Sequence, residues 1–211
     1  MQYHKIETLF ERDEVTHKVL PDKLRNSVYK IFKSWQFTEK IDGTNIRLIW
    51  EDSKFSIGGK TDNAQLDSTL VKHLYDVIDP TVFKTKFDST PVTIYGEGYG
   101  AGIQKGGAYS KTKEIIVFDV LVDNRWWVNW ENTCDIAKAF GLKTVPFIGD
   151  MSLEKGIEIV RKGFDSVLAK EQTGTVIPAE GLVGRTVETL FDKKGARIII
   201  KLKTKDFWFG G

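Results

Sequence analysis

Short strand-like segments with amphipathic helices between them constrain the fold of this chain most. Apolar residues at helical spacing predict helices at 22–32, 67–78, 132–140 and 153–162. Alternating or continuous apolar runs predict strands at 35–38, 45–50, 54–58, 92–95, 115–121, 126–128, 181–183, 186–191 and 197–202. Strands interrupted by helices, with turns that return the chain, indicate an α+β fold of mostly antiparallel sheets with flanking helices.

Charge and composition exclude several classes of protein. The 211 residues include 31 basic and 29 acidic ones, a net charge of +2, which argues against a purely electrostatic nucleic-acid binder but allows a local basic groove. The sequence contains no apolar run of membrane-spanning length, and its charged N-terminus is not typical of a signal peptide. With Cys134 as the only cysteine, we expect a reducing compartment and a cytoplasmic protein, in the host cytoplasm if the chain is viral.

The strongest local signal surrounds Lys40. This lysine lies between two apolar strand segments and is followed by Asp42-Gly43, whose glycine permits a tight turn. A lysine held away from water or near other cations loses part of its preference for the charged form and can act as a nucleophile. The alternative is an Asp-Gly hairpin that carries a solvated lysine.

A second signal is a basic strand near the C-terminus. Alternation along 197–202 puts Lys201 and Lys203 on one face, about 7 Å apart. Two ammonium groups on one pocket wall suit a phosphate or polyphosphate. The alternative is an edge strand whose lysines protect it against aggregation.

Three further pieces carry acidic or aromatic residues. Glu97 ends an apolar strand and opens a glycine-rich loop that fits neither a dinucleotide-binding nor a Walker A pattern. Phe118-Asp119 interrupts a buried-looking strand, and Glu180 precedes another strand. Taken singly, these could be a flexible turn, a satisfied core acid and a surface turn residue.

Together, the five pieces resemble the motifs of the covalent nucleotidyltransferase superfamily, which contains ATP-dependent polynucleotide ligases and mRNA capping enzymes. They occur in the family's order, as Lys-x-Asp-Gly at 40–43, Glu97, Phe118-Asp119, Glu-Gly-Leu-Val at 180–183 and Lys-x-Lys at 201–203. The sequence looks most like the nick-sealing RNA ligase 2-like group, because Asn45 stands where DNA ligases and capping enzymes usually carry arginine. The resemblance implies an ATP-grasp-like ligase adenylation domain of this superfamily.

The resemblance also implies a mechanism and its catalytic residues. Lys40 would attack the α-phosphate of ATP to form lysyl-AMP, AMP would pass to a 5′-phosphate, and a 3′-hydroxyl would then close the break. Lys201 and Lys203 would stabilise the α-phosphate charge and favour the nucleophilic form of Lys40. Asp42 and Glu180 complete the expected catalytic set, and Glu180 would orient or bind a magnesium or manganese ion.

Nucleotide contacts follow from the same resemblance. Glu97 would hold the ribose, Phe118 would stack on adenine, and Glu39 would accept the adenine amino group. Lys60 stands where the family usually has arginine, which keeps the charge but not the bidentate geometry. The full expected nucleotide-binding set is Glu39, Ile41, Asn45, Lys60, Glu97, Phe118, Lys201 and Lys203.

The expected partner is RNA, or an RNA-containing duplex with a nick, with DNA as an alternative and no membrane. We expect one nucleotidyltransferase domain over residues 1–211, without a C-terminal OB-fold or helical domain, whose role a partner protein could take over. Two other functions remain open from the sequence. One is a DNA ligase or an end-adenylating enzyme that does not seal, and the other is a nucleic-acid-binding module without catalysis.

Overall fold

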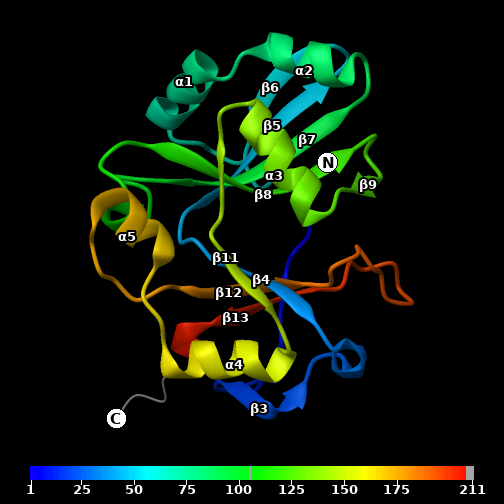
Figure 1. Ribbon diagram of the computed structural model, residues 1–211, viewed down its shortest axis with the longest axis vertical. Coiled ribbons are helices and arrows are strands. Elements are labelled where there is room, and N and C mark those ends of the chain that lie inside the picture. Colours follow the sequence, from blue (N-terminus) through cyan, green and yellow to red (C-terminus); the bar gives the residue numbers. More distant parts are fainter. Residues whose placement is uncertain (105, 208–211) are drawn as a thin grey trace. The chain divides into compact units, whose positions relative to one another are not determined.

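The computed structural model describes residues 1–104 and 106–207, whose contacts form two compact units (Figure 1). Unit 1 comprises Met1–His4, Asp42–Val145 and Glu171–Thr175. Unit 2 comprises Lys5–Ile41, Pro146–Lys170 and the described residues from Val176 onward. The mixture of mostly antiparallel sheets and helices confirms the α+β fold expected from the sequence.

Unit 1 is built on a six-stranded sheet. Its strand order is β10-β8-β7-β5-β6, and β9 also pairs with β8. The bounds are β5 Thr44–Glu51, β6 Lys54–Gly58, β7 Val92–Tyr99, β8 Glu114–Val122, β9 Trp126–Trp127 and β10 Lys143–Thr144. Helices α1 (Ser68–Val77), α2 (Pro80–Phe87) and α3 (Trp130–Ala139) contribute apolar residues to the core of this sheet. A short 3₁₀ helix, η2, covers Gly106–Ala108.

Unit 2 contains a five-stranded sheet in the order β1-β13-β12-β4-β11. Its strands are β1 Glu7–Thr8, β4 Trp35–Glu39, β11 Phe147–Met151, β12 Gly181–Arg185 and β13 Ile199–Lys203. A separate hairpin pairs β2 (Phe10–Arg12) with β3 (Val19–Leu24). Unit 2 also contains α4 (Leu153–Lys162) and the 3₁₀ helices η1 (Ser27–Ile31) and η3 (Thr204–Asp206), and α5 (Val167–Thr173) begins in unit 2 and ends in unit 1.

Two of the predicted helices form with the expected end signals. The side chain of Asp67 accepts a hydrogen bond from the Leu70 backbone N–H at the start of α1. Ser152 does the same for Lys155 at the start of α4, and Gly163 ends that helix with a φ of +76°. Each cap satisfies a donor or acceptor that the helix itself leaves free, so local sequence alone fixes these ends.

The predicted helix at 22–32 is wrong. Residues 19–24 form β3 instead, and Leu24 pairs with Phe10 of β2. The Arg25 N–H then donates to the Leu9 carbonyl at 3.0 Å, and Asn26 caps only the short η1. Pairing with the preceding strand outweighs the helical spacing, because β3 also contributes Val19 to the unit 2 core.

The predicted strand at 186–191 is also wrong. The hydroxyl of Thr186 donates to the Glu188 carbonyl at 2.6 Å, which closes a local turn. Only Phe191 makes a β-bridge, to Arg197. Local side-chain hydrogen bonding competes here with a sheet ladder.

A close contact between α4 and the sheet fixes the position of β4. Phe37 of β4 is fully buried, and a Cβ added at Gly156 of α4 would lie 2.5 Å from its ring. A Cβ at Gly184 of β12 would lie 2.6 Å from the same ring. Phe37 therefore fits between two glycines, and β4, which leads to Lys40, is held against its neighbours by this packing.

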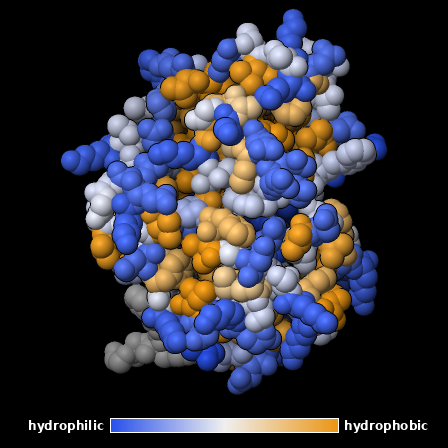
Figure 2. All heavy atoms as spheres, viewed as in Figure 1, coloured by the Kyte–Doolittle hydropathy of each residue, from blue (hydrophilic) through white to orange (hydrophobic). Residues whose placement is uncertain are grey.

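The described residues include no helix long and apolar enough to cross a membrane. On the face shown in Figure 2, hydrophobic residues occur in small patches among hydrophilic ones. This distribution is ordinary for a water-exposed surface.

The contact between Gly156 and Phe37 predicts an unusual response to substitution. Alanine at position 156 should gain about 1 kcal/mol of helix propensity but lose more to overpacking against the ring. We expect Gly156→Ala to lower the free energy of unfolding by about 1–2 kcal/mol in a urea titration. In a Phe37→Leu background the same change should be neutral or stabilising. Stabilisation of the otherwise unaltered protein by Gly156→Ala would contradict this packing account.

Candidate active site

Lys40 follows the last residue of β4, and its backbone is tied to two other segments. The Lys40 N–H donates to the Gly181 carbonyl at 2.9 Å, and the Glu39 N–H donates to the Pro146 carbonyl at 2.8 Å. The Asp-Gly hairpin considered from the sequence is wrong, because β4 and β5 belong to different sheets. The segment after Lys40 connects two sheets instead of closing a hairpin.

The Lys40 side chain faces an acidic partner instead of bulk solvent. Its Nζ lies 2.5 Å from Oε2 of Glu180, and the Nζ of Lys203 lies 3.4 Å from Oε1 of the same carboxylate. The three side chains are only 22%, 18% and 22% exposed, for Lys40, Glu180 and Lys203 respectively. One partly buried carboxylate is thus shared by two ammonium groups, which the sequence had assigned to the same site.

The main chain around Glu180 is fixed from both sides. Gly181 has a φ of +151°, and a Cβ there would collide with the carbonyl oxygen of Leu202. The N–H of Thr204 donates to the Glu180 carbonyl at 2.9 Å, and its hydroxyl donates to the Ala179 carbonyl at 2.9 Å. Sequence reasoning missed Thr204, although its place directly after the Lys-x-Lys pattern offers a signal.

Lys201 and Lys203 lie on a central strand. β13 has β12 on one side and β1 on the other, so the edge-strand interpretation of these lysines is wrong. Their neighbours Ile200 and Leu202 are buried in the unit 2 core, which places the two lysines together on the opposite face. Burial lowers the pKa of Lys201, and the nearby charges of Lys203 and Lys40 lower it further.

The carboxylate of Glu39 caps a helix. It accepts hydrogen bonds from the Ser166 hydroxyl at 2.5 Å and from the backbone N–H groups of Val167 and Leu168 at 2.9 and 3.1 Å. These donors lie at the start of α5, where a negative charge is favourable. Glu39 is 1% exposed. No local pattern could indicate this contact, because Ser166 is far from Glu39 along the chain.

The other predicted nucleotide-binding residues lie in unit 1, except Ile41, which belongs to unit 2. Asn45 of β5 is directly opposite Glu97 of β7 in the antiparallel register. The Asn45 Oδ1 is buried and has no hydrogen-bond partner among the described residues, so it is an unsatisfied acceptor. Phe118 lies at a register shift between β7 and β8, and Lys60 follows β6 on the surface.

Asp42 begins the unit 1 segment that leads into β5. Its backbone N–H donates to the Tyr109 hydroxyl at 3.4 Å. The catalytic role expected for Asp42 stays a prediction, as do the nucleotide contacts expected for the other unit 1 residues.

The acidic residues around Glu180 do not form a complete metal cage. Among the described residues, no group of three or more His, Cys, Asp or Glu side chains could hold a metal ion. Mg²⁺ does not need such a cage, since it often binds through one carboxylate together with substrate phosphates and water. Glu180 offers one carboxylate beside Lys40 and Lys203, so it fits a magnesium site of this kind.

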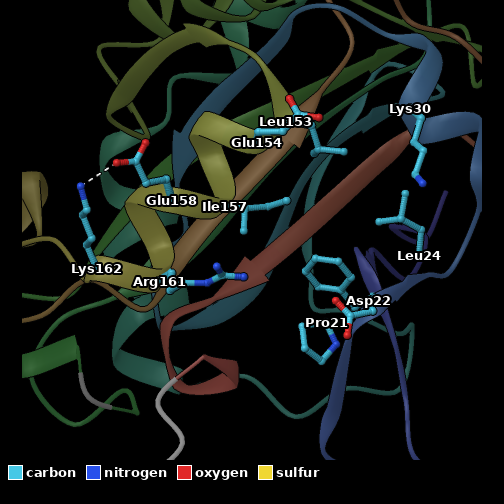
Figure 3. Close-up of a pocket in the computed structure, with 11 residues that line it drawn as sticks. Pro21, Asp22, Leu24, Lys30, Leu153, Glu154, Ile157, Glu158, Arg161 and Lys162 are labelled. Atoms are coloured by element: carbon cyan, nitrogen blue, oxygen red, sulfur yellow. Dashed lines mark hydrogen bonds and ion pairs between the residues drawn. The ribbon is translucent and has the colours of Figure 1, made fainter.

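A larger hollow in unit 2 lies away from these lysines. It has a volume of about 640 Å³ and is bounded by α4 and the β2–β3 hairpin (Figure 3). Leu24, Leu153 and Ile157 give it apolar lining, and the Arg161 side chain points from α4 into the hollow. The described residues that line it include none of the predicted site residues. Volume alone therefore does not identify the reactive site of this unit.

The comparison with protein families is consistent with this site. A family model described as RNA ligase matches residues 33–203, which include every predicted site residue. The chain therefore belongs to the RNA ligase family. A search of curated proteins found no match.

Solved structures show the same fold. Naegleria gruberi RNA ligase with PPi matches with a TM-score of 0.69 at 15% identity, over 99% of this chain and 57% of that chain. A mutant of that ligase with AMP and Mn gives a TM-score of 0.70 at 15% identity, over 98% of this chain and 57% of that chain. A mutant with ATP and Mn gives 0.69 at 14% identity, over 99% and 57%. The chain thus spans just over half the length of these structures.

Burial, together with nearby positive charge, predicts that Lys201 weakens the fold. A lysine with a lowered pKa destabilises the folded state below that pKa, and the penalty disappears when the lysine is neutral in both states. We expect Lys201→Met, which keeps the apolar stem, to raise the Tm near neutral pH by up to about 3 °C. The gain should shrink as the pH rises through the lowered pKa and disappear above the ordinary pKa of lysine. Lys23→Met, at an exposed position on β3, is the control. A lower Tm for Lys201→Met at neutral pH would contradict the electrostatic account.

Proposed function

We propose that this protein is an ATP-dependent RNA ligase that forms lysyl-AMP at Lys40 and seals 3′-hydroxyl and 5′-phosphate ends at nicks in a duplex. One observation carries the proposal. In a chain of the RNA ligase family, a partly buried lysine is joined through one carboxylate to a lysine of the Lys-x-Lys pair. Glu180 can accept the proton that Lys40 must lose, and Lys203 adds a positive charge suited to a phosphate beside it.

The first step joins Lys40 to AMP. The neutral amine forms a bond from Nζ to the α-phosphorus, while the bond from that phosphorus to the bridging oxygen of the β-phosphate breaks. Pyrophosphate leaves with the electron pair, and the nitrogen releases one of its two protons and keeps the other in the phosphoramidate. One proton passes along the hydrogen bond to Oε2 of Glu180, 2.5 Å from Nζ, and from there to water.

The surrounding side chains stabilise charge during this step. Lys201 and Lys203 donate hydrogen bonds to the oxygens of the α-phosphate. Their positive charges offset the negative charge of this phosphate as the nucleophile approaches it. Glu180 holds Lys203 in place before ATP binds. A divalent metal ion, when bound with ATP, neutralises phosphate charge, and Glu180 would be its protein ligand. The Naegleria structures with ATP or AMP and Mn support this pairing of nucleotide and metal.

The next two steps act on RNA. AMP passes from Lys40 to the 5′-phosphate of one strand, and the 3′-hydroxyl of the other strand then displaces AMP and forms the phosphodiester bond. Asn45 carries the resemblance to the RNA ligase 2-like group, in which nick sealing is the expected reaction. We also propose that the ligase acts together with a partner protein.

Labelled ATP tests the first step. The protein incubated with [α-³²P]ATP and Mg²⁺ should retain label through denaturing electrophoresis. Lys40→Arg keeps a positive charge beside Glu180 but removes the nucleophilic amine, so the label should fall by at least about 100-fold. Lys205→Arg, a basic residue of η3 outside the cluster, should label normally. Full labelling of Lys40→Arg would remove Lys40 from this role.

Nicked duplexes test the substrate class. With RNA on the 3′-hydroxyl side of the nick, sealing should be at least about tenfold faster than with DNA there, since the 2′-hydroxyl offers an extra donor and acceptor. The measurement is the rate of product formation on otherwise identical duplexes. Equal rates would favour the DNA ligase alternative. Adenylated 5′ ends without sealing on either duplex would favour an end-adenylating enzyme.

A further inference from the structure

A small basic hollow lies at the β1 edge of the five-stranded sheet, next to the lysines of β13. Its volume is about 190 Å³. Only Lys201 and Lys203 belong to the site already described, while the other lining residues come from the N-terminal part of unit 2. The described residues that line it are Lys5, Glu7, Thr8, Arg12, Arg25, Lys201 and Lys203.

The hollow carries more positive than negative charge. Glu7 is its one acidic lining residue, and it is shared by Lys5 at 3.1 Å and Arg25 at 3.5 Å. Arg12 is neutralised by Asp206, which lies 2.6 Å away outside the lining. Lys201 also lines the hollow, where the charges of Lys203 and Lys40 repel it and that of Glu7 attracts it. An anion in the hollow would therefore relieve repulsion as well as form hydrogen bonds.

The order of strands in the sheet places the hollow relative to Lys40. Lys40 follows β4, then β12 and β13 come next in the sheet, and β1 lies beyond them. The register places Thr8 of β1 beside Lys201 of β13. The two lysines of β13 therefore lie between Lys40 and the β1 edge, where the hollow is.

Phosphoryl transfer requires the attacking and leaving atoms to lie roughly in line across the phosphorus. An α-phosphate held by Lys201 and Lys203, and attacked from the Lys40 side, must expel its leaving group away from Lys40. That direction is toward β1. We propose that the hollow binds the β- and γ-phosphates of ATP and holds pyrophosphate as it leaves. This inference rests on the proposed function and adds Lys5 and Arg25 as leaving-group contacts.

These two side chains suit the task in different ways. The guanidinium of Arg25 can bind two phosphate oxygens at once, whereas the ammonium of Lys5 acts as a point charge. Lys5 is 73% exposed and Arg25 is 36% exposed, so both can be replaced without opening the core. Arg12 is less suitable for a test, because its pairing with the largely buried Asp206 holds η3.

The test uses the full chain with Lys5→Gln and Arg25→Gln combined, and Lys23→Gln combined with Lys18→Gln as the charge-matched control. Both control lysines are exposed and lie outside the hollow. Two readouts concern pyrophosphate, namely its affinity for the free protein by calorimetry and the concentration that half-saturates the discharge of preformed lysyl-AMP. A third readout is the sealing of RNA that already carries a 5′-adenylate, which needs neither ATP nor pyrophosphate.

We expect the hollow variant to weaken pyrophosphate in both assays by about tenfold or more, since two charge-assisted contacts are lost. Sealing of pre-adenylated RNA should stay within about twofold of the control pair. A variant that binds pyrophosphate as the control does overturns the inference. Loss of pre-adenylated sealing with unchanged pyrophosphate affinity also overturns it and assigns the hollow to the RNA backbone.

Failure of the proposed function would look different. In that case the unaltered protein would form no lysyl-AMP, yet calorimetry would still show whether pyrophosphate binds through Lys5 and Arg25.

A single Lys5→Glu variant provides a second probe, because it reverses the charge at a highly exposed position. It should weaken pyrophosphate binding without changing the Tm by more than about 2 °C. Unchanged pyrophosphate binding in this variant would count against the hollow.

Discussion

The arrangement of the candidate active site depends on one carboxylate shared by two ammonium groups. Glu180 lies between Lys40 and Lys203, and all three side chains are largely shielded from water. Without Glu180, Lys40, Lys201 and Lys203 would place three positive charges next to each other with little solvent to screen them. The carboxylate makes the cluster tolerable in the free protein, and the phosphates of ATP can take over that role when they arrive.

The fold brings these groups together through strand ends. Lys40 follows β4, Glu180 precedes β12 and Lys203 ends β13, and hydrogen bonds to Gly181 and Thr204 tie these ends to one another. Behind them, Phe37 sits against two glycines, so β4 has little freedom to shift. Glu39, next to Lys40, fixes the start of α5. A rigid support of this kind is what a reactive lysine needs, since small displacements of a nucleophile reduce the rate strongly.

Local signals in the sequence predicted much of this arrangement. The ends of α4 follow from Ser152 and Gly163, and the shared face of Lys201 and Lys203 follows from simple alternation. The strand expected at 186–191 failed for a local reason, the hydrogen bond from Thr186 to Glu188, whereas two other failures depended on how strands pair. The helix expected at 22–32 became a strand because β2 offered pairing, and the hairpin considered at Lys40 did not form because β4 and β5 joined different sheets. The helix cap made by Glu39 could not be foreseen, because its donors begin at Ser166.

The position of the covalent bond tests the central claim most directly. The protein would be incubated with ATP and Mg²⁺, digested under mildly alkaline conditions that preserve a phosphoramidate, and sequenced by tandem mass spectrometry. We predict one AMP adduct, located on Lys40. An adduct on another lysine, or an active ligase that shows none, would contradict the account in which Glu180, Lys201 and Lys203 prepare Lys40 for attack.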